Sequence, residues 1–325
     1  MSPGFRVCHS LEEAPDFGPC ALTIGTFDGV HAGHRHIFER VVEVGRASGW
    51  KPSVVTFTPH PATIVARERA PKLLSRADQR AEWMRQCGIE QVLVLPFDAG
   101  LAAFSPDEFA RLILAGRLGA RAVFVGDNFR FGYQQAGDAR LLAELGLAHG
   151  FTTEIVSAIQ YRRRHVSSTT IRNLISSGNV ALAARMLGRP HFLDGRLVAG
   201  RGIGSKQTVP TLNLATDSEV IPATGVYITR TRDLDSARRW NSITNIGYRP
   251  TFGQSSELSV ETFLLDPFEG EKPMRMRLEF LRRVREERKF DSPEVLRAQI
   301  LRDVARAQAY LRRIRAYCPA LAPYG

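Results

Sequence analysis

The sequence lacks the marks of several large protein classes. Its 325 residues include only four cysteines, with no CxxC pair and no Cys/His cluster, so neither a disulfide framework nor a zinc site is expected. No stretch approaches the roughly 18 uninterrupted apolar residues that a membrane span needs. The N-terminal MSPGFRVCHS also has no apolar core of a secretion signal. These absences predict a protein of the reducing cytoplasm with no membrane partner.

Acidic residues are outnumbered by basic ones. The chain has 44 Lys and Arg against 33 Asp and Glu, a formal net charge of +11, which is typical of nucleic-acid binding or of handling small polyanions such as ATP. The densest basic run, 282–289, contains two glutamates and is more typical of a solvated charged face. No nucleic-acid module is recognisable, so we expect no nucleic-acid partner. The alternative, a basic nucleic-acid-binding protein on an α/β scaffold, predicts binding that weakens steeply with salt.

The first half of the chain alternates short apolar runs with helical patterns. Strands are predicted at 21–27, 53–57, 91–95, 122–125 and 152–156, and helices at 33–48, 76–87, 106–118 and 138–149. The third helix opens with Ser105 as N-cap and Pro106 in its first turn. Each helix lies between two strands, as right-handed crossovers require. This pattern predicts an α/β domain over residues 1–186, with a doubly wound parallel sheet.

The second half changes pattern near Gly188-Arg189-Pro190, where the proline disfavours helix continuation. Period-two alternation over 226–232, 241–246, 258–265 and 274–281 predicts antiparallel strands, forming a small β-barrel over residues 187–325. A terminal helix is predicted from one apolar stripe at helical spacing, made by Leu296, Ile300, Val304, Ala307, Leu311 and Ile314. A chain of this length exceeds one hydrophobic core, which agrees with two domains.

The segment 25–34, GTFDGVHAGH, joins a predicted strand to a predicted helix through glycines and two histidines. Free N–H groups at a helix N-terminus favour an anion, and His31 and His34 lie three residues apart, on one side of the first turn. Gly33 between them permits close approach of a ligand to the backbone. The alternative is a turn with solvated histidines. The strand–turn–helix context favours phosphate binding, with both rings donating to charge that builds up on phosphorus.

Three later loops follow predicted strands, at the edge of the sheet where α/β proteins bind ligands. The loop 56–61, TFTPHP, offers an aromatic ring and two prolines, as a wall for a flat ring system or as a stiffened surface loop. The loop 126–132, GDNFRFG, suits a flavin and a phosphate, although its phenylalanines also fit a core. The segment 167–172, SSTTIR, fits a phosphate grip or an N-cap with a solvated arginine.

The second half carries a glycine-rich loop, 200–208, followed by PTLN at 210–213. Such a loop folds its amides around phosphates, and a hydroxyl beside a side-chain amide gives two oxygens for a hard cation. No βαβ unit precedes it, so a dinucleotide-binding interpretation fails. Glu261 lies in an alternating strand where Val260 and Thr262 point the other way. By itself, a glutamate on a strand is usually a solvated surface residue.

Taken in order, these motifs resemble those of bacterial bifunctional riboflavin kinase/FMN adenylyltransferases (FAD synthetases), over roughly residues 20–315. GTFDGVHAGH, TFTPHP, GDNFRFG and SSTTIR are similar to the adenylyltransferase half, a nucleotidyltransferase domain. PTLN, NIGYRPTF, SVETF and the REERKF run are similar to the kinase half. The resemblance implies that ATP phosphorylates riboflavin to FMN in the barrel. It also implies that a second ATP adenylylates FMN to FAD in the α/β domain, with Mg²⁺ as the cofactor.

The resemblance also implies roles for residues of the first domain. His31 and His34 would be catalytic. The ATP-binding residues would be Gly25, Phe27, Asp28, Gly33, Ser168, Thr169 and Arg172. The residues near the flavin would be Phe57, His60, Asn128 and Phe129, although Asn128 stands where family members often carry Asp.

For the kinase domain, the resemblance implies Glu261 as the catalytic base and Arg288 near the flavin. The ATP-binding residues would be Gly202, Gly204, Lys206, Thr211 and Asn213, of which Thr211 and Asn213 would also bind Mg²⁺. The run 205–209, SKQTV, departs from the Leu-Gly-Phe run of many relatives. An FMN adenylyltransferase with an impaired kinase domain is therefore the alternative. The sequence does not fix the oligomeric state and is compatible with a homo-oligomer.

Overall fold

A computed structural model describes residues 4–198, 211–236, 238–250, 256–268 and 270–317. The chain forms two compact units, Met1–Ser168 and Thr169–Gly325, and each is described by itself. The helices α7 (Ser168–Ser176) and α8 (Val180–Leu187) thus fall almost entirely in the second unit. The domain boundary at 186/187, which follows the change in sequence pattern, stays a prediction.

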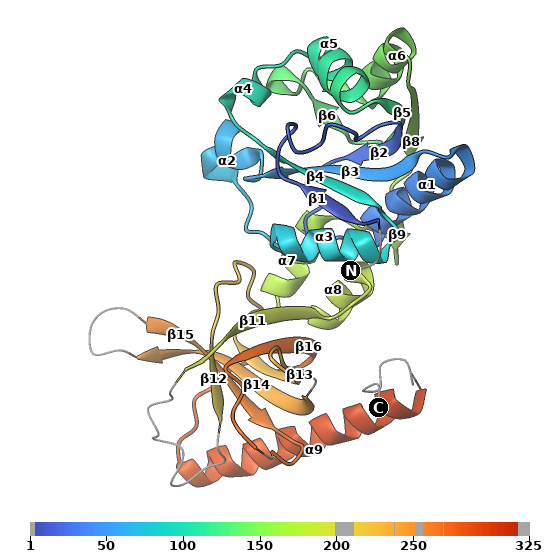
Figure 1. Cartoon of the computed structure of the whole chain (residues 1–325). Helices are drawn as coiled ribbons and strands as arrows, with labels where there is room; N and C mark the ends of the chain where they lie inside the picture. Colours follow the sequence, from blue (N-terminus) through green and yellow to red (C-terminus); the bar gives the residue numbers. More distant parts are fainter. Residues whose placement is uncertain (1–3, 199–210, 237, 251–255, 269, 318–325) are drawn as a thin grey trace. The chain divides into compact units, whose positions relative to one another are not determined.

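The first unit is built on a six-stranded parallel sheet in the order β1-β4-β3-β2-β5-β8 (Figure 1). All five predicted strands are present. The edge strand β1 was not predicted, because its three residues are too few to show a strand pattern. The strands are β1 (Arg6–Cys8), β2 (Cys20–Ile24), β3 (Lys51–Thr58), β4 (Gln91–Pro96), β5 (Ala120–Gly126) and β8 (Thr152–Val156). Two-residue strands form the hairpins β6 (Arg130–Phe131) with β7 (Gly137–Asp138) and β9 (Gln160–Tyr161) with β10 (Arg164–His165).

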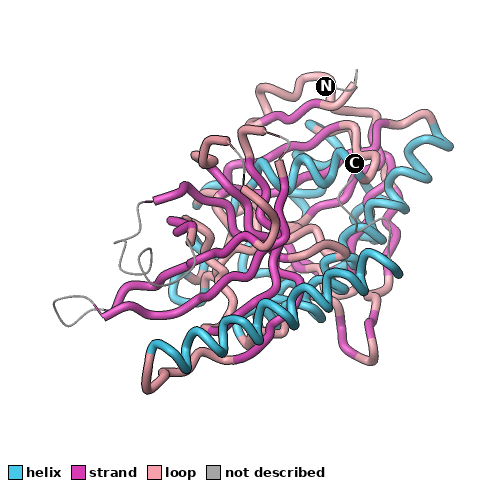
Figure 2. The backbone as a smooth tube through the Cα atoms, turned by 90° about the horizontal axis from the view of Figure 1, so that it is seen from below, coloured by secondary structure: helices cyan, strands magenta, loops and turns pink. Residues whose placement is uncertain are grey.

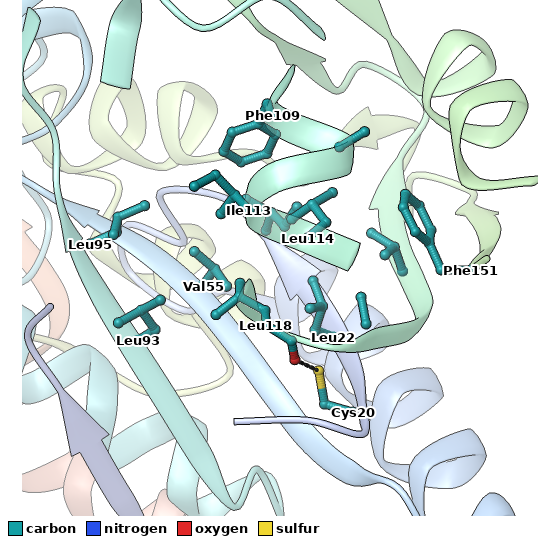
Figure 3. Packing of buried hydrophobic residues seen from close by; sticks show 14 of the residues in the cluster. Cys20, Leu22, Val55, Leu93, Leu95, Phe109, Ile113, Leu114, Leu118 and Phe151 are labelled. Carbon is teal, nitrogen blue, oxygen red and sulfur yellow. Dashed lines mark hydrogen bonds between the residues drawn. The ribbon is translucent and has the colours of Figure 1, made fainter. Parts of the chain in front are cut away.

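Helices cover both faces of this sheet, so the doubly wound prediction is confirmed. One face packs α1 (Ala32–Ser48) and α3 (Ala77–Gln86) through Phe38 and Met84. The other packs α6 (Ala139–His149) and the segment from α5 (Pro106–Glu108) through the π-helix Phe109–Arg117, as Figure 3 shows for the cluster around Leu114. Short helices are α2 (Ala62–Val65), α4 (Ala99–Ala102) and the 3₁₀ turns Arg67–Arg69 and Tyr133–Gln135.

The order of the strands creates a switch point beside β2. The chain leaves β2 for β3 on one side and later returns to place β5 on the other side. Loops at the carboxyl ends of β2 and β5 therefore diverge there, which is the position where open α/β sheets bind ligands. The segments GTFDGVHAGH and GDNFRFG are these two loops.

The second unit contains a closed antiparallel barrel in the order β11-β12-β15-β14-β13-β16. Its strands are β11 (His191–Val198), β12 (Leu212–Ala215), β13 (Gly225–Asp233), β14 (Arg239–Pro250), β15 (Ser256–Leu264) and β16 (Arg275–Arg285). The long helix α9 (Pro293–Tyr317) follows and lies along the barrel in Figure 2. The predicted barrel with a terminal helix is confirmed.

The barrel has two differently filled faces. Its interior combines apolar side chains such as Tyr227 and Phe280 with buried hydroxyls, where Thr229 bonds Ser242 at 2.8 Å and Thr244 bonds Thr262. The outer face at Ile243 packs against Ala307 and its neighbours on α9. Within the part of the chain that the structure describes, no helix is long and apolar enough to cross a membrane.

Candidate active sites

The turn after β2 has an unusual backbone. Phe27, Gly29 and Val30 all have positive φ, at 47°, 80° and 38°, and the Val30 N–H donates to the Phe27 carbonyl at 3.0 Å. A left-handed conformation costs a non-glycine residue about 1–3 kcal/mol and is a genuine outlier for β-branched valine. Such strain persists only where the surrounding structure fixes the backbone, and it is concentrated here directly before His31.

The two predicted catalytic histidines form one stacked pair. His31 is the N-cap of α1, and its Nδ1 accepts from the backbone N–H of His34 at 3.3 Å. Their ring centroids lie 3.5 Å apart with an interplanar angle of 19°, and the Phe27 ring meets His34 edge-on at 5.2 Å. The expectation that both rings lie on one side of the first turn is confirmed. Their catalytic role stays a prediction.

Two predicted glycines face these rings. A Cβ built on Gly33 would lie 3.2 Å from the His31 ring, and one on Gly25 would lie 3.0 Å from the Phe27 ring. A side chain at either position would press on an aromatic ring of the turn. The absence of a side chain at Gly25 and Gly33 therefore allows the rings to keep their positions.

Asp28 is turned into the protein. It is 1% exposed, and its carboxylate accepts the Leu74 N–H at 2.9 and 3.0 Å and the Ser75 N–H at 3.1 Å. Its carbonyl accepts the Ser168 hydroxyl at 2.9 Å. Asp28 and Ser168, both predicted to contact ATP, therefore hold the turn, and direct ATP contact stays a prediction. The sequence gives no motif for Leu74 and Ser75, which lie 46 and 47 residues away.

The predicted flavin-side residues follow β3 and β5. Phe57 and Phe129 are half-buried against the same apolar cluster; Phe57 meets Phe97 edge-on at 5.6 Å, and Phe129 stacks on Phe131 at 5.5 Å. Asn128 is exposed, with its side chain close over Gly126. His60 Nδ1 accepts the Ala62 N–H at 3.2 Å. The aromatic residues thus serve the core and leave part of their surface accessible.

The barrel brings three polar residues to one row. Glu261 on β15 is opposite Asn213 on β12 and Asn245 on β14. Directly opposed residues share a face of the sheet, so these three side chains lie together on one face. Their neighbours Leu212, Thr244 and Thr262 point into the barrel, so the face that carries the three polar residues is the outer one. The Ser259 hydroxyl donates to Glu261 Oε1 at 3.1 Å, and Thr211 is exposed just before β12. Asn213 and Glu261 therefore lie on two adjacent strands, and Thr211 directly precedes the first of them.

The remaining predicted residues fall in three places. Arg288 donates to Gln299 Oε1 at 2.6 Å and lies 4.8 Å over the Phe290 ring, so it helps to fix α9; a flavin contact stays a prediction. Thr169 and Arg172 lie in the second unit on α7, and their roles toward ATP stay predictions. Gly202, Gly204 and Lys206 lie outside the described residues.

Comparison with known proteins shows the family of this chain. Residues 13–170 match the FAD synthetase family, and residues 187–311 match the riboflavin kinase family. A bifunctional riboflavin kinase/FMN adenylyltransferase of Pseudomonas fluorescens is 37% identical over 94% of this chain and 96% of its own length. The chain belongs to the bifunctional riboflavin kinase/FMN adenylyltransferase family. A relative of the same description from Escherichia coli K12 is 33% identical over the same shares.

A solved structure is also similar over nearly the whole chain. It is described as a macrolide-efflux protein from Streptococcus pneumoniae, and it covers 94% of this chain and 99% of its own length with a TM-score of 0.82 and 25% identity. The match to the FAD synthetase family includes the strained turn, the 74–75 segment and Ser168. The match to the riboflavin kinase family includes Asn213, Glu261 and Arg288. The strained turn thus lies in the FAD synthetase match, and the polar row of the barrel lies in the riboflavin kinase match.

Proposed function

We infer that this chain converts riboflavin to FMN and FMN to FAD, using one ATP in each step. The observation that carries the inference is the match to both families, in order, within relatives that cover nearly the whole chain. The stacked histidines in the first family match and the Asn213–Glu261 pair in the second support it.

In the adenylyl transfer, an oxygen of the FMN phosphate attacks the α-phosphorus of ATP. The new P–O bond forms as the bond to the bridging oxygen breaks, and pyrophosphate leaves with that electron pair. Because no covalent enzyme intermediate is needed, the protein contributes orientation and charge stabilisation. His31 and His34 lie at the N-terminus of α1, where the helix dipole favours an anion, and are suited to donate to the charge on the α-phosphate oxygens.

In the kinase reaction, the riboflavin 5′-hydroxyl attacks the γ-phosphorus of ATP and ADP leaves. Glu261 is suited to accept the hydroxyl proton, since its half-buried carboxylate lies at the centre of the polar row on β12, β15 and β14. Thr211 and Asn213 offer the oxygen ligands that Mg²⁺ prefers, and they would hold the ion beside that carboxylate. A bound Mg²⁺ ion would neutralise part of the phosphate charge.

The narrower alternative, an adenylyltransferase with an impaired kinase, rests on the run SKQTV at 205–209, which lies outside the described residues. The riboflavin kinase family match spans this run, and the polar row beyond it is intact. Both activities are therefore proposed, in the cytoplasm where reduced thiols persist. No observation favours a nucleic-acid or membrane partner, and a homo-oligomer stays an open expectation.

The experiment that tests the function follows flavins over time. The purified chain is incubated with riboflavin, ATP and Mg²⁺, and riboflavin, FMN and FAD are resolved by chromatography. We expect FMN to appear first and FAD to follow, with neither formed without ATP. A parallel reaction starting from FMN isolates the second step. FAD from FMN without FMN from riboflavin would favour the narrower alternative, and no product in either reaction would refute the proposed function.

A further inference from the structure

The strained turn before His31 consists of residues 27–30, and its backbone needs contacts that fix it. The side chain of Ser75 contacts two of these four residues. The Ser75 hydroxyl donates to Asp28 Oδ1 at 3.1 Å and accepts the Gly29 N–H at 2.8 Å. It thus joins the side chain of one turn residue to the backbone of the next. Phe27 and Val30, on either side of this pair, are the two non-glycine residues of the turn with positive φ.

These contacts are shielded from water. Ser75 is 4% exposed and Asp28 is 1% exposed, so water does not readily replace a bond that is lost. Besides the hydroxyl bond, the Asp28 carboxylate accepts backbone N–H groups from both Leu74 and Ser75. The segment 74–75 and the turn are therefore fixed to each other through a buried, charged hydrogen-bond network.

A buried arginine lies near this carboxylate. Arg80, in the first turns of α3, is 4% exposed. Burial lowers the pKa of Arg80, and the nearby Asp28 and Asp78 charges oppose this shift. Its Nη2 donates to the Phe57 carbonyl at 3.5 Å, and among the described residues its Nε has no hydrogen-bond acceptor. Its charge is thus available to stabilise Asp28 electrostatically from the start of the helix that follows Ser75.

We propose that Ser75 is a positioning residue for adenylyl transfer, acting through Asp28 and Gly29 on the backbone that places the stacked His31–His34 pair. The proposal rests on the proposed function of the first domain. Ser75 needs no contact with substrate for this role. Its loss relaxes the turn, so the histidines no longer meet the charge of the transition state at the correct distance.

The role predicts a specific kinetic signature. Ser75→Ala should lower kcat for FAD formation from FMN by about tenfold to hundredfold, since misplacement of about 1 Å can cost a factor of 10². KM for ATP and FMN should change by no more than about threefold, because ground-state binding is not the interaction removed. Ser75→Thr keeps the hydroxyl and should restore most of kcat.

Ser53, on β3 of the same unit, offers a matched control. It is also fully buried, and its hydroxyl also makes two hydrogen bonds, donating to the Lys51 carbonyl at 2.8 Å and accepting Gln91 Nε2 at 2.7 Å. It lies towards the amino end of β3, away from the loops at the carboxyl end. Ser53→Ala should therefore lower stability without a comparable loss of kcat.

The experiment compares the full-length chain with its variants Ser75→Ala, Ser75→Thr and Ser53→Ala. For each protein it measures thermal unfolding, kcat and KM for FAD formation from FMN, and the rate of riboflavin phosphorylation. If Ser75→Ala does not fold, Ser75→Cys, with its weaker hydrogen bonds, takes its place. A selective loss of adenylyl transfer kcat, restored by threonine, supports the proposal. An unchanged kcat in folded Ser75→Ala, or an equal loss in Ser53→Ala, would overturn it. Failure of the proposed function would differ, because the unmodified chain would then make no FAD from FMN.

Discussion

Protonation of His191 should destabilise the barrel below neutral pH. The side chain lies at the start of β11, is 5% exposed, and stacks near the Phe280 ring. Its Nε2 lies 3.0 Å from the Val220 carbonyl, which only accepts, so the neutral ring carries its proton on Nε2. Burial lowers the pKa of His191 to about 4, with the Arg189 charge acting in the same direction.

The sign follows from the two protonation states. Between pH 6.5 and pH 4 the unfolded chain binds a proton at this histidine and the folded chain does not, so the free energy of unfolding falls as the pH falls. Each pH unit in this window costs about 1.4 kcal/mol. The expected loss is about 2 kcal/mol at pH 5 and on the order of 3 kcal/mol by pH 4.

The assay needs a signal from the barrel alone. The chain has three tryptophans, and only Trp240 lies in the barrel, so Trp50→Phe and Trp83→Phe leave it as the reporter. Urea unfolding is followed by Trp240 fluorescence from pH 7.5 to pH 4.5, with and without His191→Gln, which keeps an N–H donor but does not titrate. The difference between the profiles isolates His191 from titrating carboxylates. Parallel profiles over this range would refute the reasoning.

The other predictions concern the two active sites. His34→Ala, like His31→Ala, should slow FAD formation by about 10²–10³ while FMN accumulates from riboflavin; equal loss of both activities in a folded variant would contradict it. Glu261→Gln should slow riboflavin phosphorylation by about 10²–10⁴ and leave FMN-to-FAD conversion intact. Substantial kinase activity in that variant would make Glu261 structural. Lys206→Ala should raise KM for ATP in the kinase step by roughly 5- to 160-fold, from about 1–3 kcal/mol of lost charge-assisted binding. An unchanged KM at saturating riboflavin and Mg²⁺ would remove Lys206 from the site.

The sequence predicted those helices and strands that are long enough for their apolar residues to recur at regular spacing. The five main strands of the sheet and the terminal helix stripe were of this kind, and Ser105 with Pro106 marked a helix start that the structure confirms through a capping box with Glu108. The pattern could not distinguish an α-helix from the π-helix that follows, in which the Leu118 N–H reaches the Ile113 carbonyl, five residues back. Because π-helices are rare, an apolar pattern at helical spacing predicts an α-helix.

The barrel shows a different limit. Alternation indicated four strands, but β11 and β12 were not singled out, because Asp194 and Gly195 interrupt the first and the second has only four residues. Three hydroxyl side chains also point into the barrel, where apolar residues are expected: Thr229, Ser242 and Thr244. They are tolerated because they bond one another inside the barrel.

Site residues close together in the sequence were predictable, and those brought together by the fold were not. His31, Gly33 and His34 lie within one turn, so spacing alone placed their rings together. The Asp28 carboxylate, by contrast, is bound by Leu74 and Ser75, which lie 46 and 47 residues away in a segment without a motif. The segment GTFDGVHAGH thus combines two kinds of residue: two histidines whose catalytic role stays a prediction, and an aspartate that is turned into the protein and holds the turn before them. Substitution of Ser75, outside every recognised motif, is therefore the sharper test of whether a strained backbone at this turn is needed for adenylyl transfer.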